Sequence, residues 1–136
     1  MRNILPLILL TLSAMLLSGC GQTKVTGTVS FPDGSPLTTG TIIFEDDKNS
    51  YTATIKDDGS FKMGMLKDGE GIPPGQYRVA IMAVDPESDN DVETQATSKA
   101  RFLTHPKYAS SRTSGITYDV QKNMNITITV EKPAGQ

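Results

Sequence analysis

One stretch of the sequence decides the fold class: Gln76-Tyr77-Arg78-Val79-Ala80-Ile81-Met82-Ala83-Val84. Tyr77, Val79 and Ile81 recur at every second position, with Arg78 and Met82 among the residues between them. A period of two places alternate side chains on opposite faces of a β-strand, whereas a helix repeats every 3.6 residues. The stretch therefore predicts a strand with one buried face, entered from the rigid turn Pro73-Pro74-Gly75.

The same alternation recurs on both sides of this strand. It covers residues 25–31, 41–45, 51–55, 61–63, 116–120 and 126–130, and turn-forming Gly, Pro, Asp and Ser separate several of these runs. The sequence Asp57-Asp58-Gly59 between two of the runs predicts a tight hairpin. About seven short strands without a helical stripe predict an all-β sandwich.

Composition narrows the possible functions of the 136-residue chain. It holds 13 Lys and Arg against 15 Asp and Glu, for a formal net charge of −2, so a basic nucleic-acid-binding surface is not expected. A single Cys excludes an internal disulfide framework, and a single His leaves little for a zinc centre. The length suits one ordinary domain. We expect no cofactor and no nucleic-acid partner.

The first residues have the pattern of a secretory signal peptide. Arg2 supplies the positive start, and residues 4–17 are almost wholly apolar. This apolar run is shorter than the roughly 20 residues that span a bilayer. We therefore expect residues 1–19 to be removed.

The run ends in Leu17-Ser18-Gly19-Cys20, which resembles a complete bacterial lipobox. The Cys20 thiol is the nucleophile that such a motif supplies for a diacylglyceryl group. The new amino terminus can then be acylated, for example by palmitate. Several acyl chains give stable anchoring, because each buried methylene contributes about 0.8 kcal/mol. An ordinary signal peptide or a buried apolar Cys is the alternative.

This resemblance predicts a lipoprotein of the bacterial cell envelope. Residues 20–24 form a short lipidated tether, so the domain should lie close to the membrane surface. Gly21 occupies the position where Asp would signal inner-membrane retention in the known sorting rule. By that resemblance an outer-membrane location is favoured over the inner membrane.

The order of the later segments resembles carboxypeptidase regulatory-like domains. Residues 25–31, then Asp33 to Leu37, then residues 40–44 are similar to their opening, Asp57 to Phe61 to their central hairpin, and Ile72 to Val79 to their "G-x-Y-x-V" strand. Residues 107–120 resemble the tail typical of small bacterial lipoproteins of this type. The resemblance implies a single transthyretin-like (prealbumin-like), Greek-key β-sandwich over residues 25–131, a tail at 132–136 and a role without catalysis.

A long segment without periodicity, residues 85–115, holds a cluster of acids. Hard cations such as calcium prefer several oxygen ligands, but the EF-hand pattern with its central Gly is absent. A solvated acidic loop is the alternative, and the expected metal content is none. The five candidate ligands are Asp85, Glu87, Asp89, Asp91 and Glu93.

The same segment holds three candidate partner-binding residues, His105, Tyr108 and Arg112. His105 could serve a hydrolase only with a positioned nucleophile, and no G-x-S-x-G turn occurs. Tyr108 and Arg112 could contact a sugar or an acid, although Tyr108 also suits an anchor packed on the core. A surface-loop role is the alternative for His105.

The leading hypothesis is a membrane-anchored envelope lipoprotein whose non-catalytic β-sandwich binds a protein or glycan partner. Two alternatives remain open: an envelope hydrolase centred on His105, and a calcium-dependent adhesion module using residues 85–93. No catalytic residue is assigned in the leading hypothesis.

Cys20→Ala should abolish lipidation and leave a soluble or uncleaved form, because Cys20 is the only thiol in the chain. Membrane fractionation and the mass of the intact protein measure this. A variant that still partitions with membranes and carries acyl chains would contradict the lipoprotein hypothesis.

Overall fold

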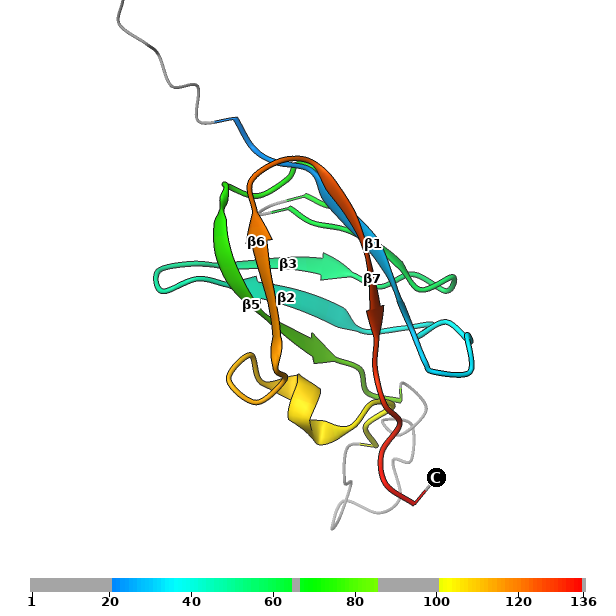
Figure 1. Ribbon diagram of the computed structural model, residues 1–136. Coiled ribbons are helices and arrows are strands. Elements are labelled where there is room, and N and C mark those ends of the chain that lie inside the picture. The colour runs from blue at the N-terminus through cyan, green and yellow to red at the C-terminus, as the bar shows by residue number, and fades with distance from the viewer. Residues whose placement is uncertain (1–20, 65–66, 86–100, 136) are drawn as a thin grey trace, which may run out of the picture.

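The computed structural model describes residues 21–64, 67–85 and 101–135 (Figure 1). They form an all-β sandwich of two sheets, which confirms the predicted fold class. The seven strands are β1 (Val25–Ser30), β2 (Thr41–Glu45), β3 (Ser50–Thr54), β4 (Ser60–Lys62), β5 (Gly75–Met82), β6 (Ile116–Val120) and β7 (Met124–Thr129). One short 3-10 helix, η2 (Pro106–Ala109), precedes β6. Each strand lies within two residues of a run predicted from the alternation.

The two sheets have the strand orders β4-β1-β7 and β3-β2-β5-β6. All neighbouring strands are antiparallel except β1 and β7, which run parallel over their full length, from Val25 opposite Met124 to Ser30 opposite Thr129. The first and last strands therefore lie side by side (Figure 1). The chain passes from one sheet to the other between β1 and β2, β3 and β4, β4 and β5, and β6 and β7.

The core lies between the sheets and is built from alternate residues of the strands. Tyr77, Val79 and Ile81 of β5 are buried as the alternation predicts, and Leu37 folds back so that its N–H donates to the Val29 carbonyl (2.9 Å). Burial of this apolar surface is the main favourable term in folding. The largest fully buried side chains also include Phe44, Phe61, Ile42, Met63, Ile72, Val25, Val29 and Val120.

The predicted hairpin at Asp57-Asp58-Gly59 is a tight turn, but it does not join two strands of one sheet. The Lys56 N–H donates to the Ser60 carbonyl (2.9 Å), and Gly59 has φ +81°. Beyond the turn, β3 continues into the four-stranded sheet and β4 into the three-stranded sheet. The prediction of a regular hairpin was wrong, because β3 pairs with β2 and β4 pairs with β1. The chain changes sheet at the turn, and each run buries its apolar face in the shared core from a different sheet. Among the described residues, an isolated bridge from Thr52 to Gly64 links the two runs farther out.

Gly27 is a point of close approach in the three-stranded sheet. A Cβ at this position would lie 2.8 Å from the Phe61 ring and would also clash with the Ile126 backbone. Glycine in a strand interior often marks such an approach. Its place between β4 and β7 allows the small core to close.

The segments expected to be a tether and a tail take part in the fold. The Thr23 N–H donates to the Ile72 carbonyl (2.7 Å), and the Ile72 N–H donates back (2.9 Å). At the other terminus, the Lys132 ammonium lies 3.6 Å from the Asp33 carboxylate. Residues 1–19 and Cys20 lie outside the described residues. Within the described ranges, no helix is long and apolar enough to cross a membrane.

Gly59→Val should destabilise the protein by about 1–3 kcal/mol, because a β-branched residue resists positive φ. A side chain here would also meet the Val29 carbonyl at 2.6 Å and the Pro36 side chain at 3.1 Å. Gly34→Val is the matched control, since Gly34 has φ +87° but open space around it. Denaturant unfolding should give a clearly larger loss for Gly59→Val, and equal losses would show that the contacts do not matter.

Candidate functional site

The outer face of the four-stranded sheet, the face turned away from the core, is the candidate site. Its side chains come from alternate positions of neighbouring strands, and the ladders place Glu45 of β2, Arg78 of β5 and Thr117 of β6 in one row. Gln76 and Asp119 form the next row. The buried residues on either side of each outward residue fix the strand in place. The outward side chains are therefore held at fixed positions, from which polar groups can contact a ligand or a partner.

Residues 105–115 cross the far end of the sandwich and reach this outer face. At one end of the segment, the His105 N–H donates to the Glu131 carbonyl (2.8 Å). At the other, the Ser111 hydroxyl donates to the Glu45 carboxylate and the Ser114 hydroxyl to the Val79 carbonyl. The segment is therefore fixed to the chain just after β7 and to the four-stranded sheet.

Residues 109–112 explain why the outward side of β5 is not uniformly exposed. β6 pairs with β5 only as far as Val79, and residues 109–112 lie beside the part of β5 beyond it. Ala80 is buried there although it points away from the core, whereas Met82 remains 45% exposed. Ala80 therefore departs from a simple division of β5 into buried and exposed alternate residues.

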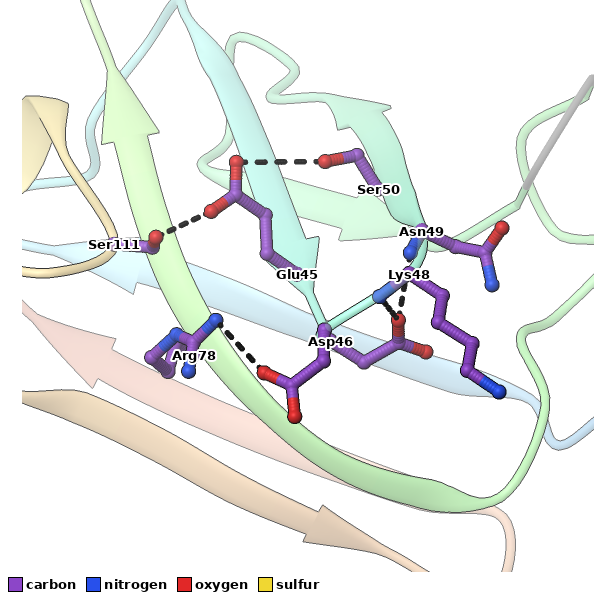
Figure 2. Close-up of polar contacts among 8 residues, drawn as sticks. Glu45, Asp46, Lys48, Asn49, Ser50, Arg78 and Ser111 are labelled. Carbon is purple, nitrogen blue, oxygen red and sulfur yellow. Dashed lines mark hydrogen bonds and ion pairs between the residues drawn. The ribbon is translucent and has the colours of Figure 1, made fainter.

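The Glu45 carboxylate links three elements (Figure 2). One of its oxygens accepts from Ser111, and the other accepts from Ser50 of β3 at 3.4 Å. Across the same face, the Arg78 guanidinium lies 3.4 Å from the Asp47 carboxylate. Both partners of that ion pair are well exposed, so it contributes little to stability.

The adjoining turn fixes a further carboxylate. Asp46 accepts the backbone N–H groups of Lys48 (2.7 Å) and Asn49 (2.6 Å). These hydrogen bonds lower the pKa of Asp46, since they favour its charged form. Asp46 therefore stays negative at neutral pH, close to Glu45 and Asp47.

Two grooves meet at Glu45. The first has a volume of about 420 Å³, and four acids and Arg78 are among its lining residues. The second, of about 410 Å³, is lined by Ile43, Ala80 and Met82 and by residues 109–112. The face thus combines a small apolar strip with a charged, hydroxyl-rich border.

A buried aromatic cluster underlies this face. The Phe44 ring stacks on Tyr118 at 6.0 Å, and the Tyr77 ring meets Tyr51 edge-on at 5.8 Å. The Tyr77 hydroxyl donates to the Pro73 carbonyl (2.6 Å), and burial raises the pKa of Tyr77 to about 12. Its phenol is therefore neutral and structural rather than a proton donor for chemistry.

The three candidate partner-binding residues are not gathered in one place. Arg112 lines the second groove, while His105 and Tyr108 line neither groove. Tyr108 is buried, and its hydroxyl accepts the Glu131 N–H (3.3 Å), so its role as an anchor on the core is confirmed. Its ring is not available to stack on a ligand.

His105 serves as the N-cap of η2. Its Nδ1 accepts the backbone N–H of Lys107 (3.1 Å), which satisfies one of the unpaired donors at a helix start. The Lys107 ammonium lies 2.7 Å from Glu131, and this contact lowers the pKa of the Glu131 carboxyl. The surroundings of His105 thus hold the helix in place.

Of the acidic cluster, only Asp85 belongs to the described residues, and its carboxylate lies 4.0 Å from the Arg101 guanidinium. Glu87, Asp89, Asp91 and Glu93 lie outside them. Among the described residues, no group of three or more His, Cys, Asp or Glu side chains is arranged to hold a metal ion.

Sequence reasoning missed Glu45, Ser111 and the apolar strip. The alternation of β2 marks Glu45 as an outward residue after the buried Phe44. Nothing in the pattern of residues 105–115 indicates which strand the segment will contact. That information comes from the fold alone.

Comparison with known proteins assigns the chain to no family. The chain matches no protein-family model, no curated protein and no solved structure at a significant level.

Ser111→Ala should destabilise the protein by about 1 kcal/mol, because it removes a hydrogen bond to a charged group at a buried position. It should also speed amide exchange in residues 110–114. Ser50→Ala is the matched control on the same carboxylate, and its longer, exposed contact should cost under about 0.5 kcal/mol. Equal effects of the two changes would contradict the idea that Ser111 fastens the segment.

Proposed function

We propose that this protein is a lipid-anchored, non-catalytic lipoprotein of the bacterial cell envelope that binds a partner protein through the outer face. The anchor is the proposed acylation of Cys20. Thr23, three residues later, is hydrogen-bonded into the fold, so acyl chains on Cys20 would lie close to the sandwich.

The outer face has the composition of an interaction surface. Met82 is the one large apolar side chain exposed among the described residues, and it lies beside Ile43 and Ala80 in the second groove. Arg112 lines the same groove, and Arg78 lies in the adjoining one. Protein interfaces favour this arrangement of a small apolar centre with Met and Arg inside a polar rim.

A protein partner is favoured over a glycan by the placement of the aromatic residues. Sugar rings are commonly bound on exposed aromatic faces, and the chain has no Trp. All its Tyr and Phe residues belong to the described part, where five are buried and Phe31, Phe102 and Tyr118 are half-buried. No open aromatic platform is therefore available on the described surface.

The hydrolase alternative is less well supported. A general base needs a free lone pair within reach of its substrate. The Nδ1 lone pair of His105 accepts the Lys107 N–H, which leaves the proton of the neutral ring on Nε2. Freeing a lone pair for catalysis would cost the cap of η2. The calcium-dependent alternative depends on acids that lie largely outside the described residues.

The family and location are proposals of the same kind. The family is proposed from the resemblance of the sequence segments to carboxypeptidase regulatory-like domains, whose implied role is accessory rather than catalytic. The outer membrane is proposed from Gly21 after the acylated Cys. Neither proposal is needed for the partner surface.

A photo-reactive amino acid at Met82 in the full-length chain, irradiated in intact cells, tests the function. We expect one discrete protease-sensitive adduct, and its loss when Arg112→Glu is added. The same probe at Thr127, exposed on the other sheet, should give no adduct. Equal labelling at both positions would contradict the partner surface, and a protease-resistant adduct would favour a glycan.

A further inference from the structure

The end of the sandwich at which the chain arrives from Cys20 is built from three segments. We call it the entry end: residues 22–24, Lys62 with the following loop 67–74, and the turn 121–123. Besides the Thr23 to Ile72 pair, the Lys24 N–H donates to the Asn123 side chain (2.9 Å), and the Met124 N–H donates to the Lys24 carbonyl (3.0 Å). In Figure 1 the entering chain and the turn between β6 and β7 lie at the same end of the molecule.

Four exposed lysines gather at the entry end. Lys24 precedes β1, and Lys62 lies beside it because Thr26 pairs with Lys62 in the β1 to β4 ladder. Lys67 begins the adjoining loop and Lys122 lies in the turn. None of these four ammonium groups forms an ion pair with another described residue. By contrast, Lys107 and Lys132 at the far end have carboxylate partners.

The acids of the same end do not neutralise the lysines. They are Asp68, which lines a groove with Lys24 and Lys62, and Glu70 in the same loop. Four lysines against these two acids give the entry end a net charge of +2. Asp119 of β6, just outside the entry end, accepts from the Gln121 side chain (2.6 Å), and counting it lowers the net charge to +1. The chain from Cys20 onward carries 12 basic and 15 acidic side chains, a net charge of −3. The entry end is thus the positive end of an acidic domain.

We propose, on the basis of the proposed acylation of Cys20, that the entry end rests on anionic phospholipid headgroups. Only Gly21 and Gln22 separate Cys20 from Thr23, so the acylated residue lies at most about 11 Å from the fold. That distance is comparable to the Debye length of about 8–10 Å, within which unpaired charges at a surface still interact. Lysines near an anionic membrane surface are attracted to it.

The proposal fixes the orientation of the domain. The Met82 end of β5 lies away from the entry end, because β5 begins there at Gly75 and runs from it. The outer face then opens sideways and is not covered by the membrane. A short tether and a lysine-bearing end together hold this orientation, which a single flexible anchor would not.

Lysine reactivity in vesicles tests the proposal. The full-length protein, processed in cells, is purified and its intact mass measured; a mass without acyl chains overturns the proposed anchor, whatever the lysines do. The acylated protein is placed in vesicles of phosphatidylethanolamine with phosphatidylglycerol, and acetylation is followed by peptide mass spectrometry. Lys24, Lys62, Lys67 and Lys122 should react about fivefold more slowly than Lys56, which lies at the other end of β1.

Changing the lipid and the salt concentration distinguishes protection caused by charge from protection caused by closeness to the membrane alone. We expect the protection to disappear in phosphatidylcholine vesicles and at high salt, because both remove the attraction. Protection that persists in both would mean that the tether alone buries this end and would overturn the role of charge. Reactivity equal to that of Lys56 in anionic vesicles, with acylation intact, would overturn the orientation.

Variants provide the matched comparison. Replacing the four lysines of the entry end by Gln should remove the additional protection from amide exchange that anionic vesicles give to residues 22–26. Lys48→Gln with Lys56→Gln, two exposed lysines outside the entry end, should leave it unchanged. Circular dichroism checks that both variants fold, and equal behaviour of the two would contradict the proposal.

Discussion

The parallel pairing of β1 with β7 is the interaction on which the rest of the structure depends. It joins segments about a hundred positions apart, as the hydrogen bond from Lys24 to Asn123 shows. Closing such a long loop costs chain entropy before any contact compensates for it. The compensation comes from the ladder hydrogen bonds and from buried apolar side chains, and Gly27 permits both because the absence of a side chain lets Phe61 and Ile126 approach β1. With β1 held in the centre of its sheet, the second sheet has a surface to pack against.

The far end of the sandwich is closed by side-chain contacts of residues 105–115 rather than by a strand. Tyr108 fills the gap with a buried ring, and its hydroxyl receives the Glu131 N–H. Ser111 and Ser114 carry the chain from there onto the four-stranded sheet. Small hydroxyl side chains suit this task, because they satisfy polar groups at the sheet without needing space. His105, the only histidine of the chain, serves as the N-cap of η2 in the same segment.

These constraints divide the surface by function. The entry end carries unpaired lysines close to the proposed anchor, and the outer face carries Met82 within a rim of charges. A domain held near a membrane can meet other proteins only through surfaces that the bilayer does not cover. The direction of β5 separates the entry end from the Met82 end of the outer face, since β5 begins at the first and ends beside the second.

The sequence by itself determined the strands, because a period of two is a local property that each run carries in full. It therefore predicted the all-β class, the inward residues and the tight turn at Gly59. Only the tertiary structure decided that β3 and β4 belong to different sheets, that β1 lies beside β7, and that Ser111 contacts Glu45. Alternation states which face of a strand is buried, but it is silent on the neighbour of that strand. Pairing and the course of residues 105–115 follow from packing over the whole core, where contacts distant in sequence outweigh local preference.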